Sequence, residues 1–235
     1  MFTKISSTIL SILLFLALYG SRSNPYIFST AILVLIFVTF GLNLKRLNFT
    51  WPHLLLPTTF ILGASAIFVA ISSPTIRVGF LLIASIIFYF LEMKLGHESH
   101  FLQNIYLLNV FALYLGMFAI QFDYHLSVFW ILPAAFCLSY IFAIQGFAGF
   151  SLPIKKYFYF LIALVCTEAA FGLALWPTHF FVDAVVLFYL FYVQWLLSFS
   201  AFFGKLSRQK IYWQLTLLAI VLLLTLTTAA WRPLR

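Results

Sequence analysis

The sequence predicts an all-α integral membrane protein, one domain over residues 1–235 that forms a bundle of about nine transmembrane helices. Hydrophobic residues make up 65% of the 235 residues and charged residues only 8%, whereas soluble domains are about half apolar and about a quarter charged. The mean hydropathy is +1.11. The apolar residues run continuously instead of alternating as in barrel strands. Because backbone groups inside hydrocarbon must pair within the protein, each span is expected to be a helix.

Nine apolar runs come close to the about 20 residues that a helix needs to cross roughly 30 Å of hydrocarbon. The expected spans are Ile5–Gly20, Tyr26–Leu42, Trp51–Ile71, Ile76–Met93, Phe101–Phe122, Leu126–Gly146, Tyr157–Trp176, Phe180–Phe203 and Ile211–Trp231. Five of the six Trp residues lie at or near span ends, as interface residues do. The first run is short, but Leu18–Gly20 matches a small-x-small cleavage site poorly, so we expect a retained helix rather than a signal peptide.

The basic residues predict how the helices are oriented. With the N-terminus and the even-numbered loops placed on one side, that side holds nine of the 13 Lys and Arg residues, including every Lys. All the loops are short, so the positive-inside rule applies. We therefore expect the N-terminus in the cytoplasm and the C-terminus outside. The expected location is a bacterial cytoplasmic (inner) membrane.

The composition excludes a soluble enzyme, a nucleic-acid-binding domain, a disordered tail and a disulfide scaffold. The net charge of +8 comes from basic residues between apolar runs, which suits loops that face anionic lipid rather than nucleic acid. Cys137 and Cys166 lie inside apolar runs and fit no disulfide or metal pattern. The expected partners are the lipid bilayer and either another membrane protein or a second copy of the chain.

Glu168 is the most informative candidate residue, because ionisable groups inside a membrane are costly and often functional. It lies 11 residues into the seventh run, about 16 Å deep at 1.5 Å per residue. It could bind a proton, a cation or a cationic substrate, or it could hydrogen-bond across a helix interface. The small residues Ala170, Gly172 and Ala174 fit either hypothesis, because they let another helix approach closely.

Gln194 and Asn109 are candidate neighbours of Glu168 in a polar seam. Gln194 lies nine residues from the end of the eighth run, about 14 Å deep, and Asn109 in the fifth run is nearly as deep. Antiparallel packing of the seventh and eighth helices could bring Glu168 and Gln194 together, in a bond worth about 0.6 kcal/mol on average. The alternative is that each amide bonds a neighbouring backbone group.

His179 and Asp183 form a second candidate pair at the start of the eighth run. They are four residues apart, so on a helix they share a face. They could form an outward-facing ion pair, a gate or half of a metal site. The alternative is that Asp183 simply occupies the first helical turn, where negative charge suits the helix dipole.

The fourth loop holds weak metal candidates. His97 and His100 lie near Glu92 and Glu98, but the two histidines are three residues apart, whereas the zinc-protease helix motif needs a spacing of four. The alternative is an ordinary loop, so no metal is expected. No cofactor is expected either, because the chain has no phosphate-binding glycine loop and the ninth run has no Lys for a retinal Schiff base.

Three hypotheses about function remain, and none of them has a complete catalytic set. The first is a small integral subunit or assembly partner of a larger membrane complex, favoured by the short loops and the single central acid. The alternative is a transporter of small solutes or protons that uses Glu168, with Pro57 and Pro133 predicting helix breaks inside two spans. An intramembrane enzyme acting on lipid or polyprenyl substrates is a third hypothesis, which rests only on His97, Glu98 and His100.

Overall fold

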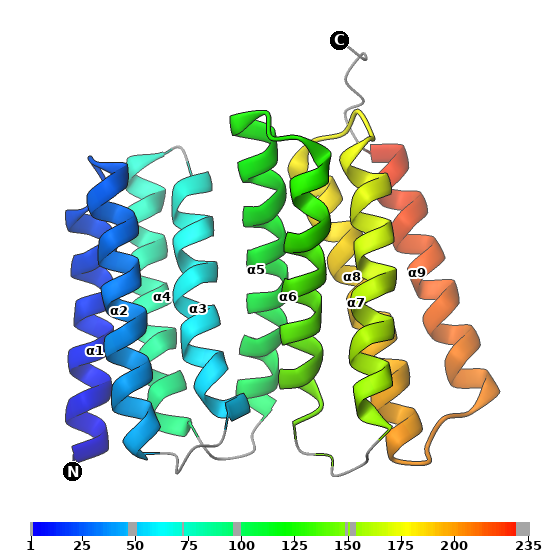
Figure 1. Ribbon diagram of the computed structural model, residues 1–235, viewed down its shortest axis with the longest axis horizontal. Helices are drawn as coiled ribbons and strands as arrows, with labels where there is room; N and C mark the ends of the chain where they lie inside the picture. The colour runs from blue at the N-terminus through cyan, green and yellow to red at the C-terminus, as the bar shows by residue number, and fades with distance from the viewer. Residues whose placement is uncertain are drawn as a thin grey trace. The chain divides into compact units, whose positions relative to one another are not determined.

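The computed structural model describes residues 2–46, 51–71, 73–95, 100–148, 150 and 154–228. Over these residues the protein has nine α-helices and no strand (Figure 1), which confirms the predicted all-helical class. The helices are α1 (Phe2–Gly20), α2 (Pro25–Arg46), α3 (Trp51–Ala70), α4 (Pro74–Lys94), α5 (His100–Tyr124), α6 (Ile131–Gly146), α7 (Lys155–Ala174), α8 (Phe180–Phe202) and α9 (Arg208–Thr228), with a 3₁₀ helix, η1 (Val128–Trp130), directly before α6.

The helix bounds lie within a few residues of the predicted spans, except at the sixth. Residues 126 and 127 are not helical, and the α-helix begins only at Ile131, after η1. Pro133 is then the third residue of α6, in the first turn, where the absent N–H has no helical partner to lose. Pro133 still lies inside the sixth span as predicted, because η1 and α6 together form the span Val128–Gly146. Pro57 does lie inside α3, as predicted.

Seven of the described helices are long and apolar enough to cross a membrane: α2 and α4 to α9, with η1 included in the span of α6. The other two, α1 and α3, contribute shorter apolar stretches, Lys4–Gly20 and Leu54–Ala70. The protein is therefore a multi-pass, membrane-embedded helical protein. The predicted helix count is met over the described residues, and seven of these helices have the length of a full span.

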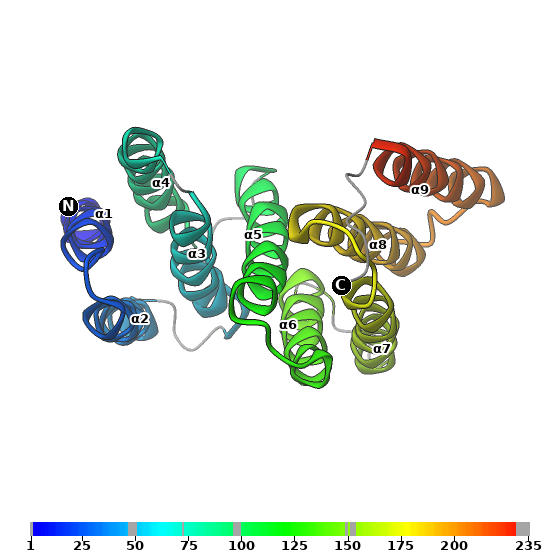
Figure 2. The ribbon, with the colours of Figure 1, turned by 90° about the horizontal axis from the view of Figure 1, so that it is seen from above.

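The chain divides into two compact units, which we describe separately. Unit 1 is Met1–Leu113 and unit 2 is Tyr114–Arg235, so α5 contributes residues to both. In unit 1 the helices α1 to α4 form a closed ring of neighbours, in which each helix packs on the next and α4 packs on α1 (Figure 2). Leu10, Leu14 and Leu18 are fully buried. Their spacing of four residues places them on one face of α1, which packs into this ring.

Within unit 1, α3 and α5 come close together at Gly63. A Cβ atom built on Gly63 would lie 3.0 Å from the Cβ of Ala112 and 3.9 Å from the Cα of Asn109. A side chain at this position would meet Ala112 more tightly than most Cβ contacts, so α3 and α5 would have to move apart by a few tenths of an ångström.

In unit 2, α7 packs between α6 and α8, and α9 lies against α8 (Figure 1). Large side chains fill the interior. Tyr114, Phe142, Phe147 and Phe191 are all fully buried. By contrast, α9 has no buried residue among those described, so its apolar faces are available to lipid or to another protein.

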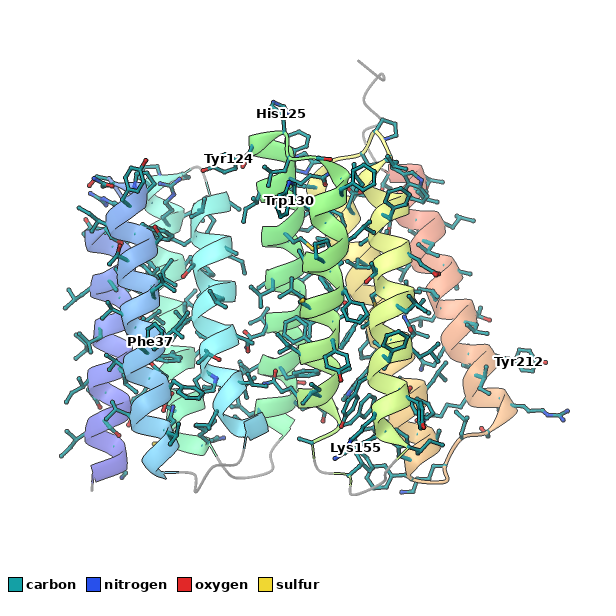
Figure 3. All side chains as sticks on the ribbon, viewed as in Figure 1. Phe37, Tyr124, His125, Trp130, Lys155 and Tyr212 are labelled. Atoms are coloured by element: carbon teal, nitrogen blue, oxygen red, sulfur yellow. The ribbon has the colours of Figure 1, made fainter. Side chains whose placement is uncertain are left out.

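Both ends of unit 2 carry residues that are common at membrane interfaces. Tyr124, His125 and Trp130 gather at one end, and Lys155 lies at the other (Figure 3). His125 has a positive φ of 50°, and the next N–H, that of Leu126, donates to the carbonyl of Gln121, which closes the end of α5. Tyr157, two residues from Lys155, is also exposed, so exposed aromatic residues lie at both ends, as they do at both membrane interfaces.

Candidate functional site

Glu168 lies on an exposed face of α7. The neighbouring Leu164 and Phe171 on this face are exposed and apolar. The helix ends at Ala174, so Glu168 is about 9 Å from that end and about 20 Å from Lys155 at the other end. The residue therefore lies in the half of the span nearer Ala174. The predicted depth of Glu168 near the middle of the membrane stays a prediction.

The rotation of α7 explains why Glu168 points outward. Successive helical residues turn by about 100°, so Cys166 and Glu168 project about 200° apart. Cys166 is fully buried, as are Ala163 and Ala170 about one turn to either side. This buried stripe packs against the neighbouring helices of unit 2. The opposite face of α7 carries Glu168. Ala170 therefore packs inside the unit and does not lie beside the acid.

Gln194 hydrogen-bonds to groups other than Glu168. Its Nε2 donates to the carbonyl of Leu190 at 3.3 Å and lies 3.7 Å from the Sγ of Cys166. Gln194 is eight residues from Phe202, about 12 Å from that end of α8, whereas Glu168 is about 20 Å from the adjacent end of α7. The described hydrogen bonds therefore do not join Glu168 to Gln194, and the two side chains lie at different distances from this end of the helix pair. Gln194 follows the alternative of bonding a backbone group.

Four polar residues of unit 2, one from each of the helices α5 to α8, meet in its interior: Tyr114, Ser139, Cys166 and Gln194. We call them the polar node. The Oη of Tyr114 and the Oγ of Ser139 are 2.7 Å apart, and the thiol of Cys166 is within hydrogen-bonding reach of both and of Gln194. Tyr114, Ser139 and Cys166 are fully buried. None of the four is a carboxylic acid, a lysine or an arginine. The hydrogen bonds that link the four helices are therefore between neutral groups.

Aromatic rings enclose the polar node. The ring of Tyr114 meets Phe142 and Phe191 edge-on, with centroids 6.2 Å apart in each pair, and the two phenyl rings are 6.1 Å apart. Such edge-to-face contacts contribute beyond simple burial of area. Nearby, the indole N–H of Trp195 donates to the carbonyl of Gly146 at 3.4 Å. The polar node is thus part of a packed interior that fixes the helices of unit 2.

Asn109 makes a buried contact in unit 1. Its Nδ2 lies 3.3 Å from the Oγ1 of Thr59 and 3.4 Å from the carbonyl of Leu56. That carbonyl directly precedes Pro57, inside α3. The amide therefore ties α5 to α3 beside the proline. Asn109 follows the alternative prediction, in which an amide bonds the backbone of a neighbouring helix.

His179 and Asp183 shape the start of α8. His179 is the N-cap residue, and its Nδ1 accepts a hydrogen bond from the backbone N–H of Phe181 at 3.3 Å. Asp183 lies buried in the first turn and accepts a 2.5 Å hydrogen bond from the hydroxyl of Thr178. The position of Asp183 matches the alternative prediction of a negative charge that suits the helix dipole. A gating or metal-binding role for His179 and Asp183 stays a prediction.

The fourth loop, with His97 and His100, is only partly described. His97 and Glu98 lie outside the described residues, and His100 begins α5 although its side chain also lies outside them. Over the part of the chain that the structure describes, no three His, Cys, Asp or Glu residues come together as a group that could hold a metal. The weak metal-binding hypothesis for His97 and His100 therefore stays untested.

Unit 1 contains a buried acid–amide pair that was not predicted. The Nδ2 of Asn43, on α2, donates to the Oε1 of Glu92, on α4, at 2.8 Å. Their side chains are only 2% and 1% exposed. Asn43 lies one residue beyond the expected second span. In the sequence, Glu92 lies next to the polar residues of the fourth loop. The structure places both inside the helix bundle, where the amide satisfies one oxygen of the acid.

A shallow groove of about 470 Å³ runs along α1 and α4 on unit 1. Its lining is mainly apolar, with side chains such as Phe15 and Leu82, and includes the hydroxyl residues Ser11 and Ser85. An apolar groove on a membrane helix suits an acyl chain. It contains no residue of the polar node and no acid, so it adds no chemistry to the candidate site.

Comparisons of the chain with protein-family models, with curated proteins and with solved structures find no match. The inference of function therefore starts from the residues and their geometry. Among these, Glu92 and Asp183 receive hydrogen bonds inside their own units. Within the described part of the chain, neither Asp123, one residue from the end of α5, nor Glu168 forms a hydrogen bond or ion pair, and of the two only Glu168 lies well inside its helix.

Proposed function

We propose that the protein is a small integral subunit or assembly partner of a larger membrane complex. The observation that carries this proposal is the position of Glu168, an acid on an exposed, apolar face of a helix long enough to cross a membrane. A charged side chain inside a membrane helix is costly, up to about 2.5–3.5 kcal/mol at the helix centre on insertion scales, and such groups normally face protein or water. A neighbouring protein that covers this face would remove that cost.

The transport hypothesis loses part of its support. It depends on Glu168 and Gln194 lining a shared polar site. The structure instead directs Gln194 toward Cys166 and places Glu168 about 200° from that thiol around α7. An acid that serves transport from this position would have to act on the outer surface of unit 2 rather than between α7 and α8.

Purification from the native membrane in a mild detergent tests the assembly role. We expect the 27.0 kDa chain to elute with another integral membrane protein at fixed stoichiometry, as determined by native mass spectrometry. Recovery of the chain alone, or only with copies of itself, would contradict the proposal. A lone chain that retains a bound solute, and whose solute uptake is lost in Glu168→Gln, would favour transport.

We further place the N-terminus in the cytoplasm, the C-terminus outside, and the protein in a bacterial cytoplasmic membrane. The support is the distribution of lysines over helix ends on one predicted side. The lysines within the described residues are Lys4, Lys45, Lys94, Lys155, Lys156, Lys205 and Lys210. Alkaline phosphatase fused to the C-terminus should be active and green fluorescent protein there should be dark. The reverse pattern would contradict the nine-span topology.

A further inference from the structure

The exposed face of α7 has the composition of a lipid-facing surface except at one position. Leu161, Leu164, Phe171 and Leu175 are large, apolar and at least 37% exposed. They recur at the three- and four-residue spacings that mark one side of a helix. Glu168 lies in the middle of this stripe. A carboxyl group does not stabilise a contact with lipid tails, whereas it can stabilise a specific contact with another protein.

The chain has no described cation at the depth of Glu168. Lys155 and Lys156 begin α7, about 20 Å from Glu168, and Arg208 and Lys210 lie in the first turn of α9. These basic side chains sit at helix ends, where they reach the interface. A second copy that docked through the same face would bring two carboxyl groups together, which is electrostatically unfavourable. Charge complementarity therefore favours a different chain that supplies a cation inside the membrane.

Gly172 provides the space for such a chain. It lies one turn beyond Glu168, toward the end of α7 at Ala174, and therefore on the same side of the helix. A Cβ atom built on Gly172 meets no heavy atom within 4 Å. The glycine thus leaves the α7 backbone open at this level. Small residues at such positions allow two membrane helices to pack at short range.

We propose that the α7 face around Glu168 and Gly172 docks a transmembrane helix of another protein that carries a lysine or arginine inside the membrane. This inference rests on the proposed function and names the chemistry of the partner. The basic side chain of the partner pairs with the carboxyl group of Glu168, and the partner backbone crosses α7 at Gly172. The ion pair is made inside hydrocarbon, where neither charge is stable alone, so it also selects against helices without a basic residue.

A synthetic helix tests this chemistry without prior identification of the partner. The probe is a leucine-rich transmembrane peptide of about 20 residues with one lysine about six residues from one end, which matches the depth of Glu168. Energy transfer between a dye on the peptide and a dye at the C-terminus of the purified protein is measured in phosphatidylcholine vesicles. We expect binding to the wild-type protein, and about tenfold weaker binding to Glu168→Leu.

Two matched controls isolate charge from packing. The same peptide with leucine in place of its lysine should bind the wild type about as weakly as the lysine peptide binds Glu168→Leu. Gly172→Leu should also weaken binding of the lysine peptide, whereas Gly79→Leu, at an equally open glycine on α4 of unit 1, should not. Equal binding of the lysine peptide to the wild type and to Glu168→Leu would overturn the inference, as would equal binding of the two peptides to the wild type.

Native purification of Glu168→Leu separates failure of this inference from failure of the proposed function. If the wild type retains a membrane-protein partner and Glu168→Leu loses it, both are supported. If both forms retain the partner, docking uses another face and this inference is overturned, while the proposed function stands. If the wild type has no protein partner, the proposed function fails. Cross-links between the α7 helices of two copies in vesicles without peptide would identify a second copy as the occupant and overturn the inference.

Discussion

Two acids of the chain, Glu92 in unit 1 and Glu168 in unit 2, have opposite surroundings. In unit 1, Glu92 is 1% exposed and receives a hydrogen bond from the amide of Asn43 at 2.8 Å. In unit 2, Glu168 is exposed and the buried polar node beside it is neutral. Glu92 therefore contributes to the fold of the chain itself, whereas Glu168 contributes nothing to the described interior of its unit. The difference supports the proposal that Glu168 serves contacts with another molecule.

The largest expected effect comes from breaking the buried pair of unit 1. Asn43→Leu removes the donor and leaves the carboxyl group of Glu92 buried with one hydrogen bond fewer. We expect the free energy of unfolding in detergent micelles to fall by about 1–3 kcal/mol. Glu168→Leu should change it by less than about 0.5 kcal/mol, as for other exposed substitutions. Chemical denaturation of both purified variants, followed by circular dichroism, makes this comparison.

A large loss of stability in Glu168→Leu would reverse the assignment. It would mean that the acid has a donor within the purified chain, and the exposed face of α7 would no longer need an external partner. Asn43→Gln is a useful companion variant, because it keeps the amide but extends it by one methylene. Partial recovery of stability in Asn43→Gln would identify the hydrogen bond, rather than the volume of the side chain, as the source of the effect.

Two glycines provide a second comparison between the units. A Cβ on Gly63 would meet Ala112 at 3.0 Å, whereas a Cβ on Gly172 meets nothing within 4 Å. Gly63→Leu should therefore overpack the α3–α5 contact and destabilise the purified protein by about 1–3 kcal/mol. Gly172→Leu should leave the purified chain at least as stable, because leucine has a higher helix propensity than glycine. Thermal unfolding in micelles distinguishes the two.

The outcome that contradicts this second comparison is equal destabilisation by both leucines. That result would place another part of the same chain over Gly172. If Gly172→Leu is instead silent in the purified chain but weakens the native complex, Gly172 contributes to docking and not to folding. The pair of variants therefore separates the two roles that small residues have in membrane helices.

The helices could be predicted from the sequence, and the direction in which Glu168 points could not. An apolar run of membrane length is a local property, so α7 and α8 were expected within two residues of their observed ends. The rotation of a helix is usually indicated by an apolar and a polar side. Here Leu161 faces outward and Ile162 faces the core, and these two side chains have nearly the same hydrophobicity. Lipid and protein interior favour the same residues, so composition does not distinguish the faces.

The buried pair of unit 1 had a detectable signal in the spacing of polar residues. Thr39 and Asn43 continue the buried positions of Ile32 and Leu35 on α2 at intervals of three and four residues. A polar residue that continues a buried stripe is expected to find a polar partner. That partner, Glu92, is 49 residues away in the chain, and no local pattern connects the two. The identity of the pair therefore depends on tertiary packing.

The smallest expected effect concerns the neutral interior of unit 2. Tyr114→Phe removes the hydroxyl that lies 2.7 Å from the Oγ of Ser139 and keeps the ring against Phe142. We expect a loss of about 0.6 kcal/mol, up to about 1.7 kcal/mol, the range for hydrogen bonds between membrane helices. Tyr212→Phe is the control, because Tyr212 is 69% exposed on α9. Chemical denaturation in micelles again provides the measurement.

The double variant Tyr114→Phe with Glu168→Leu tests whether the two faces of α7 contribute independently to the free energy of unfolding. The polar node contacts α7 through Cys166, and Glu168 projects about 200° from it, so the two sites share no described hydrogen-bonding partner. Their effects on the free energy of unfolding should therefore add to within about 0.5 kcal/mol. A larger departure from additivity would show that the exposed acid is energetically coupled to the interior of unit 2. In that case the contrast between a structural acid in unit 1 and a docking acid in unit 2 would fail, because Glu168 would influence the packing of its own unit.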